Sequence, residues 1–241
     1  MGRVENWEAG ALAEHRHDRH QLVYASKGII YLTALNRVWL IPPGRALWIQ
    51  GGTHHAFNVR RSAEVIVLYI DPLIDPLGGG SKCFVAEVGG LMKELMRSCA
   101  GLAWDYQSGS EADRLTAVLI DQVKYLKLQP LDLPMPSDPR AIKLARILKK
   151  EAANRESIAV LATRIGASKR TLERLFEKET GVSLGLWRFR QKMIYSLELL
   201  ARGESVSNTS IDVGYDSPSA FVVAFKSFFG QTPSRYIGKN Q

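Results

Sequence analysis

The five histidines of this chain are confined to two short stretches near its start. Three of them are His15, His17 and His20, and the other two are His54 and His55. Neutral imidazole is the commonest side-chain ligand of metal ions in proteins, and it suits zinc and iron. The type and spacing of these residues therefore raise a Zn- or Fe-type ion as one hypothesis. Alternatively, these histidines bind no metal and simply line a polar pocket or lie at the rim of a β-barrel.

Basic residues are concentrated in the carboxyl-terminal part of the chain. From residue 139 onward there are 18 Lys and Arg against 9 Asp and Glu, a net charge of +9. The first 138 residues hold 14 against 15, so the whole excess lies beyond them. Positive charge gathered on one part of a protein is an electrostatic signature of phosphate binding. The asymmetry indicates nucleic acid as the partner of this part.

One short unit occurs twice in the basic part. Residues 207–237 predict a short helix, a turn at Gly214, and a second helix that starts at Ser217-Pro218 and ends at Gly230. The earlier copy turns at Gly166, and the copies are offset by 48 residues before the turn glycine and 49 after it. Such a pair of helices is a helix-turn-helix unit. The later second helix is expected to bury one stripe of residues, namely Ala220, Phe221, Ala224, Phe225, Phe228 and Phe229.

The segment between the two copies, Ser183 to Arg202, predicts one amphipathic helix. Twenty residues at about 1.5 Å each make a rod of about 30 Å. Successive major-groove faces of B-DNA lie roughly 34 Å apart. The predicted helix therefore has a suitable length to hold two DNA-reading units one helical turn apart.

Residues 139–238 resemble the DNA-binding domain of the AraC/XylS family of bacterial transcription regulators. The resemblance lies in the run VGYDSPSAF..AFKSFFGQTPSRY, in the earlier S.RTL.R.F...TG.SL..W, and in the connecting helix that begins at Leu186-Trp187-Arg188. It implies an all-α domain of seven helices, with two recognition helices that enter adjacent major-groove segments. The partners that it implies are double-stranded DNA, a small-molecule effector, a second copy of the chain and, for an activator, RNA polymerase.

The two predicted recognition helices offer DNA different side chains. The first, from Ser168 to Thr180, presents Arg170 and Arg174 opposite its apolar face, with Glu173 on the flank. Arginine suits the O6 and N7 acceptors of guanine, and glutamate accepts from N4 of cytosine. The second presents mainly valines, which contact a thymine methyl group without a donor or acceptor, so we expect it chiefly to position the domain. The candidates for base reading are Arg170, Glu173, Arg174, Ser219, Val222 and Val223, and those for phosphate contact are Lys169, Arg188 and Lys226.

Residues 21–70 predict a small antiparallel barrel or jelly roll. Short runs rich in Val, Ile, Leu, Tyr and Trp are separated by Gly, Pro and Asn turns, at intervals of eight to ten residues. The predicted strands are 21–26, 29–34, 37–41, 46–50, 56–60 and 64–70.

Two motifs in this part resemble those of cupins, and sensor domains of AraC-type regulators are commonly cupin-like. The run G-x4-H-x-H-x3-Q-x6-G from Gly10 resembles the first motif, with Gln in place of Glu. The run G-x5-Q-x-G-x2-H from Gly44 resembles the second, with Gln in place of Pro. The resemblance implies an effector or dimerisation domain in which a Zn- or Fe-type ion would be held by His15, His17, Gln21 and His55. Because Gln removes the anionic ligand, a pocket without metal stays an alternative.

Beyond these strands the pattern becomes helical and then breaks at prolines. Apolar residues repeat at helical spacing over 91–96, and a capped helix starts at Ser110. These helices are expected to cover the open side of the barrel, to form a dimer interface, or to do both. Three prolines within 130–136 predict a semi-rigid linker. We thus expect a cupin-like barrel at 1–80, a helical hairpin at 81–129, a linker at 130–138 and a DNA-binding domain at 139–241.

The amino-acid composition narrows the classes of protein to which this chain can belong. A hydrophobic content of 46% allows packed cores, and Cys83 and Cys99 form neither a zinc spacing nor a disulfide framework. No run approaches the ~18 apolar residues of a membrane span, and the polar start lacks a signal-peptide core. We expect a cytoplasmic regulator and not an enzyme. Two alternatives stay open: a metal-dependent cupin enzyme fused to a DNA-binding domain, and a constitutive DNA binder whose barrel only dimerises.

Overall fold

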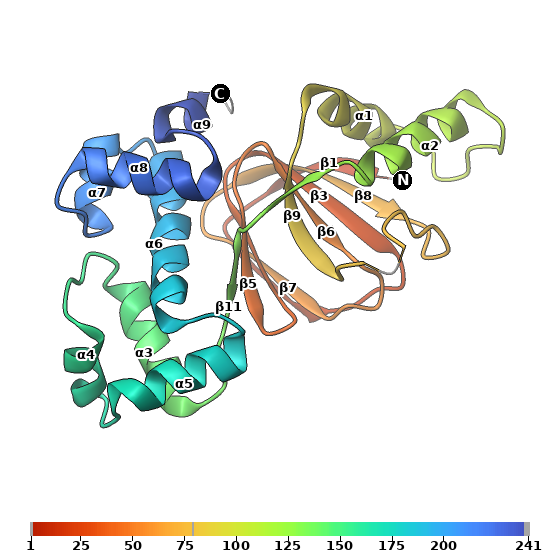
Figure 1. Cartoon of the computed structure of the whole chain (residues 1–241). Coiled ribbons are helices and arrows are strands. Elements are labelled where there is room, and N and C mark those ends of the chain that lie inside the picture. Colours follow the sequence, from red (N-terminus) through yellow and green to blue (C-terminus); the bar gives the residue numbers. More distant parts are fainter. Residues whose placement is uncertain (1, 79, 239–241) are drawn as a thin grey trace. The chain divides into compact units, whose positions relative to one another are not determined.

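The computed structural model describes residues 2–78 and 80–238, which divide into two compact units (Figure 1). The first consists of the residues up to 35 and of 39–132, and the second of 36–38 and the residues from 133 onward.

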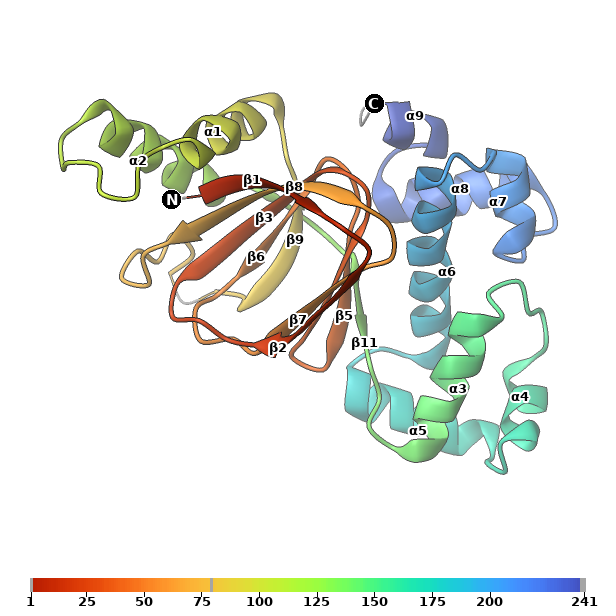
Figure 2. The ribbon, with the colours of Figure 1, turned by 180° about the vertical axis from the view of Figure 1, so that it is seen from behind.

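The described strands form two antiparallel sheets that face each other (Figure 2). The larger sheet has the strand order β1-β8-β3-β6-β9-β10, and the smaller sheet has the order β11-β5-β4-β7-β2. The strands are β1 (Gly2–Trp7), β2 (Gly10–His15), β3 (His20–Lys27), β4 (Ile30–Ala34), β5 (Arg37–Ile41), β6 (Arg45–Ile49), β7 (His55–Val59), β8 (Ala63–Ile70), β9 (Cys83–Glu87), β10 (Lys127–Gln129) and β11 (Asp132–Pro134).

Strands β3 to β8 match the six predicted strands to within one residue at nearly every end. The prediction that the first strand begins near residue 21 is wrong, because β1 and β2 precede it. Both are edge strands, and most of their residues are exposed. They therefore lack the buried apolar run that marks a strand in a sequence. Strand β9 also lies inside the segment 81–129, which was expected to be a helical hairpin.

Two helices, α1 (Gly90–Ala100) and α2 (Glu111–Val123), pack on one face of the six-stranded sheet. Alternate side chains of the sheet, such as Leu22 and Leu68, form an apolar cluster with Met96 and Leu119. The helices thus cover the outer face of this sheet and not an open side of a closed barrel. Helix α2 starts as predicted, because the Ser110 side chain accepts a hydrogen bond from the backbone of Asp113.

The second unit is helical. Its helices are α3 (Pro139–Lys150), α4 (Ile158–Arg164), α5 (Lys169–Thr180), α6 (Leu184–Ala201), α7 (Val206–Asp212), α8 (Pro218–Phe229) and α9 (Pro233–Gly238). Helix α6 is a rod with α3 to α5 at one end and α7 to α9 at the other (Figure 1). On α8 the buried stripe is narrower than expected, because Phe221, Phe225 and Phe229 are buried whereas Ala220 is exposed.

The proline-rich segment before α3 is packed and not a free spacer. Leu131 and Leu133 are buried, and residues 132–134 form β11. The buried indole of Trp187 on α6 donates a hydrogen bond to the carbonyl of Pro134 at 2.6 Å. Part of the expected linker at 130–138 therefore belongs to the folded structure. None of the helices within the described residues combines the length and hydrophobicity that crossing a membrane requires.

Candidate effector site and nucleic-acid interface

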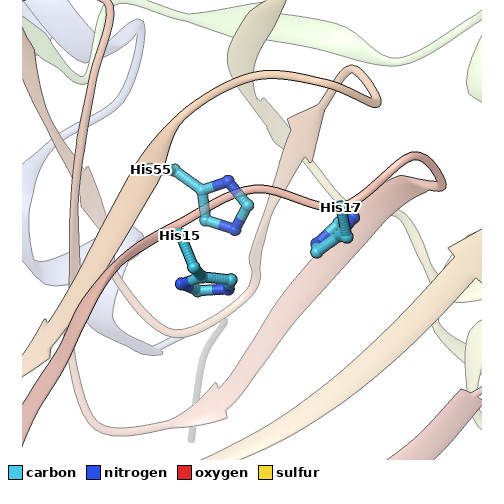
Figure 3. A group of neighbouring side chains, drawn as sticks. All are labelled: His15, His17 and His55. Atoms are coloured by element: carbon cyan, nitrogen blue, oxygen red, sulfur yellow. The ribbon is translucent and has the colours of Figure 1, made fainter.

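Three of the predicted ligands meet in the first unit (Figure 3). His15 at the end of β2 pairs across the ladder with His55 at the start of β7, and His17 lies in the turn that follows β2. The ring centroid of His55 is 4.4 Å from that of His15 and 5.1 Å from that of His17. One nitrogen of each ring lies within 4.8 Å of the others. We call these residues the histidine triad.

Two glycines hold the turn that carries His17 against the turn that precedes His55. The backbone N–H of Gly52 donates to the carbonyl of His17 at 2.8 Å. A Cβ atom on Gly51 would lie 2.0 Å from the carbonyl oxygen of Asp18, so glycine is required for this approach. The neighbouring His20 stays outside the triad, because its Nδ1 accepts a hydrogen bond from the backbone of Gly51.

Backbone carbonyls accept a hydrogen bond from Nδ1 of all three rings. The Nδ1 atoms of His15, His17 and His55 each lie 2.8–2.9 Å from a carbonyl oxygen two residues away. A carbonyl only accepts, so each Nδ1 is the donor of its hydrogen bond. Histidines that bind metals commonly use their second nitrogen in this way, which orients the ring. Nε2 of His17 lies 3.3 Å from the amide oxygen of Gln21, which also only accepts, so this nitrogen faces an acceptor and not a donor.

His55 is the most buried member of the triad, with only 1% of its surface exposed. Burial lowers its pKa, which the hydrogen bond to the carbonyl of Thr53 partly opposes and the neighbouring His15 and His17 lower further. Its Nε2 has no hydrogen-bond partner among the described residues. A neutral ring with a buried, unused acceptor fits a metal ion or a donor group on a ligand.

The fourth predicted ligand, Gln21, reaches the triad from the facing six-stranded sheet. Its Oε1 lies 3.3 Å from Nε2 of His17, and its Nε2 lies 3.5 Å from the hydroxyl of Tyr69. Within the described chain, the group of potential ligands around this point contains the three imidazoles and no carboxylate. Among the described residues, the site therefore offers imidazole nitrogens and an amide oxygen without an anionic ligand.

The two predicted helix-turn-helix units have the same backbone plan. Helices α4 and α7 have 7 residues each, and α5 and α8 have 12 each. The turn glycines Gly166 and Gly214 have φ values of 73° and 76°. The side chains of Ser168 and Ser217 cap the second helices, as expected from the sequence. The internal repeat is thus a repeat of structure.

Helix α5 presents the charged side chains that were expected to read bases. Arg170, Glu173 and Arg174 are exposed, whereas Leu172 and Phe176 on the opposite face are fully buried. Lys169 forms an ion pair with Glu173 at 3.6 Å. Within the described residues, neither the guanidinium of Arg170 nor that of Arg174 has a hydrogen bond or an ion pair. Both guanidinium groups can therefore meet DNA without losing an internal contact.

Helix α8 presents a smaller and less polar outward face. Ser219 and Lys226 are exposed, Val222 is half-buried, and Val223 has 69% of its surface exposed. An exposed valine in the middle of a helix has no packing role within the unit. A methyl contact to a base is the only base-specific interaction that it can make.

Arg188, expected to contact a phosphate, has a structural role within the unit. Its guanidinium is half-buried and donates to the carbonyls of Asn154 and Glu156 at 2.6 and 3.0 Å, and burial lowers its pKa. These bonds commit two of the five N–H donors of the guanidinium within the unit. Arg188 therefore holds the segment between α3 and α4.

Sequence reasoning missed a set of contacts that joins the two helix-turn-helix units. Arg155, before α4, pairs with Asp216 at 2.5 Å and donates to the carbonyl of Tyr215 at 3.0 Å. A Cβ atom on Gly214 would lie 2.9 Å from the carbonyl oxygen of Ala153. The turn of the second unit thus packs closely on the segment that precedes the first. Single loop residues carry no periodic signal that could have predicted these contacts.

Two family profiles match the chain. Residues 6–123 match the AraC-like ligand binding domain, and residues 161–239 match the helix-turn-helix domain. The HTH-type transcriptional regulator NimR of Escherichia coli (strain K12) is 33% identical over 225 residues, which cover 93% of this chain and 82% of NimR. The HTH-type transcriptional regulator RipA of Corynebacterium glutamicum is 35% identical over 103 residues, which cover 43% of this chain and 31% of RipA. A crystal structure of ToxT from Vibrio cholerae is similar over 98% of this chain and 94% of that chain, with 15% identity and a TM-score of 0.41.

The similarity to NimR runs through both units and not only through the helical one. The relatives are regulators of transcription, so the activity of this chain is DNA-binding regulation and not catalysis. A cupin enzyme fused to a DNA-binding domain is therefore set aside. The chain belongs to the AraC family of helix-turn-helix transcription regulators, with an amino-terminal ligand-binding domain and a carboxyl-terminal DNA-binding domain.

Proposed function

We propose that this regulator places α5 and α8 in two adjacent major-groove segments of one DNA site. The observation that carries the proposal is the repeated pair of helices at the two ends of α6 (Figure 1). Helix α6 has 18 residues, and its length of about 27 Å at 1.5 Å per residue approaches one turn of B-DNA. The repeated units then meet the same face of the duplex one turn apart.

Within this arrangement the two helices have different tasks. Arg170 and Arg174 donate to guanine acceptors, and Glu173 accepts from cytosine once its ion pair with Lys169 opens. Lys169 then contacts a phosphate. On α8, Ser219, Val222 and Val223 lie against the base edges, and Lys226 binds phosphate. Strong sequence preference therefore comes from α5.

The amino-terminal unit senses an effector and joins two copies of the chain. We assign its facing sheets, which β9, β10 and β11 extend beyond residue 80, to a cupin-like jelly roll, and helices α3 to α9 to the seven-helix DNA-binding domain from residue 139. Leu91 on α1 and Val118 on α2 are 61% and 45% exposed, and such apolar side chains suit a subunit interface. The homodimer works in the cytoplasm, where DNA is, and contacts RNA polymerase if it activates.

The experiment is selection of DNA sites from a random pool by the full chain, followed by binding titrations at several salt concentrations. We expect one enriched site with two preferred stretches about one turn apart. Affinity should fall steeply with salt, because each phosphate contact contributes about −0.9 to the slope. Lys143→Ala changes an exposed residue of α3 that is not among the proposed DNA contacts. This control variant should leave the salt slope unchanged. Enrichment of a single short stretch would overturn the two-groove arrangement.

A further inference from the structure

We propose that the amino-terminal unit binds a small aromatic carboxylate in a cavity outside the histidine triad. The cavity has a volume of about 260 Å³ and is lined by β8, by the turn before β3, by α1 and α2, and by the loop 101–110 that joins these helices (Figure 1). This inference rests on the proposed function, since it names the chemical class of the effector through which that unit would control DNA binding.

The inner part of the cavity is apolar. Leu68 and Ile70 of β8 and Leu119 of α2 line it, and all three belong to the buried cluster between the six-stranded sheet and its two helices. Cys99 of α1 adds a thiol that stays neutral, because burial raises its pKa. An apolar cavity of about 150 Å³ is large enough to bind benzene. The larger cavity of this chain therefore has room for an aromatic ring with a short substituent.

Arg19 supplies a positive charge at the exposed side of the cavity. Its guanidinium carbon lies 5.9 Å from the ring centre of Trp104, and within the described residues the guanidinium has no hydrogen bond or ion pair. A planar guanidinium with unused N–H groups suits a carboxylate, which it binds through two parallel hydrogen bonds. Asp71 also lines the cavity and would repel an anion, but its carboxylate accepts a hydrogen bond from the backbone N–H of Leu73 and is held in the turn after β8.

Aromatic side chains line the cavity beside Arg19. Trp104 and Tyr106 lie in the loop between α1 and α2, and Tyr69 lies on β8. The ring centres of Tyr69 and Trp104 are 6.1 Å apart. Trp104 has 56% of its surface exposed, although its indole is a large apolar group. A bound ring would cover part of this surface and pack against the other rings, so the cavity favours an aromatic ligand over an alkyl one.

The cavity adjoins the histidine triad but does not include it. Neither the triad nor any other matching residue of the cupin-like motifs is among the described residues that line the cavity. Tyr69 connects the two places, because its ring centre lies 5.4 Å from that of His17. Nδ1 of His17 also donates a hydrogen bond to the carbonyl of Arg19 at 2.8 Å. A ligand that fixes Arg19 therefore also restrains the turn that carries His17.

The test is calorimetric titration of the full chain with benzoate, benzamide and benzylamine, which share a ring but differ in charge. We expect one benzoate per chain, with the other two compounds bound at least tenfold more weakly. Arg19→Gln should weaken benzoate binding about ten- to hundredfold, as expected for a charge-assisted hydrogen bond, and should leave benzamide binding unchanged. Arg16→Gln is the matched control, because that exposed arginine lies in the same turn and does not line the cavity.

Two further measurements distinguish the parts of the site. Cyclohexanecarboxylate keeps the charge but lacks the aromatic ring, so it should bind about two- to tenfold more weakly than benzoate. Benzoate should also change the tryptophan fluorescence of the wild type, and Trp104→Phe should abolish this change while the other four tryptophans remain.

Three results would overturn the inference. One is equal benzoate affinity in the wild type and in Arg19→Gln. Another is tighter binding of benzylamine than of benzoate, which would assign the polar end of the site to Asp71. The third is a wild-type chain that binds its DNA site but no benzoate, and this result would leave the proposed function standing.

DNA titrations with and without saturating benzoate complete the design. We expect benzoate to change the affinity for the selected site by about fivefold or more in the wild type and in Arg16→Gln, but not in Arg19→Gln. One benzoate per chain with unchanged DNA affinity would overturn the role of aromatic carboxylates as effectors. One benzoate per chain without any preferred DNA site would instead overturn the proposed function and leave the ligand site intact.

Discussion

The α4–α5 and α7–α8 units share a backbone but differ in the side chains that they turn outward. Their helix lengths, serine caps and left-handed turn glycines agree. Their outward faces are Arg170 and Arg174 in one unit and Ser219 and Val223 in the other. The shared positions are those that the fold requires, and the differing positions are those that we propose to meet DNA. The comparison indicates that one architecture carries a hydrogen-bonding reader and a mainly positioning unit.

The largest effect that we expect from this comparison is on the free energy of unfolding, and it concerns the hydrophobic cores of the two helix-turn-helix units. Phe176 and Phe225 occupy equivalent positions, and each is fully buried. Truncation of a buried Phe to Ala costs about 3–5 kcal/mol, so both variants should lower the free energy of unfolding by that amount. Urea unfolding of the full chain measures it.

Leucine at the same positions sharpens the comparison of the cores. Phe225 packs near three rings, those of Phe221, Phe229 and Tyr236, whereas Phe176 packs near Trp187. Because each aromatic pair adds about 0.5–1.5 kcal/mol, Phe225→Leu should cost more than Phe176→Leu. Equal losses would show that the aromatic contacts of the second unit add nothing beyond burial.

The turn glycines provide the next comparison. Both need a positive φ, so alanine at either position costs roughly 1–2 kcal/mol of strain. A Cβ atom on Gly166 meets nothing within 4 Å, whereas one on Gly214 lies 2.9 Å from a backbone oxygen. Gly214→Ala should therefore destabilise the chain more than Gly166→Ala in the same unfolding assay. The reverse order would contradict the close packing of the second turn.

Measurements of DNA affinity should distinguish the outward face of α5 from that of α8. Arg174→Ala removes a guanidinium that is proposed to grip a guanine, so it should cost about 1–3 kcal/mol of binding and relax one base position. Val223→Ala removes only methyl contacts and should cost less than about 1 kcal/mol. Titrations on the selected site and on its single-base variants measure both. A change of base preference by Val223→Ala as large as that by Arg174→Ala would make α8 a full reader.

The smallest effect should come from Lys226→Ala. Loss of one phosphate contact flattens the dependence of log affinity on log salt by about 0.9 and weakens all sequences alike. Lys143→Ala on α3 should leave the slope unchanged. A loss confined to one sequence would instead assign Lys226 to base reading.

The starts of helices could be predicted from the sequence, because the capping hydrogen bond that fixes each start is local. Ser110, Ser168, Ser183 and Ser217 were predicted helix starts, and each side chain caps the following helix. Capping joins atoms two or three residues apart, so the pattern shows directly in the sequence. The approach of His15, His17 and His55 was also expected, because their motif resembles that of cupins.

Contacts between distant residues were beyond prediction from the sequence. The edge strands β1 and β2 form because β8 and β7 lie beside them, although their own residues are mostly exposed. Arg188 looked like a phosphate contact until its partners, more than thirty residues away, were known. The hydrogen bonds from Nδ1 of the triad to backbone carbonyls depend on turn geometry, which the motif does not specify.

The most direct test of the unequal readers is a base-by-base substitution of the selected DNA site, with the affinity of the full chain measured for every variant. The account predicts two stretches about one helical turn apart. Substitutions in one stretch should cost about 1–3 kcal/mol each, as expected for arginine contacts to guanine, and those in the other should cost clearly less. Arg174→Ala should abolish preference only in the first stretch. Two stretches of equal base preference, or a loss of preference in both on Arg174→Ala, would contradict the account.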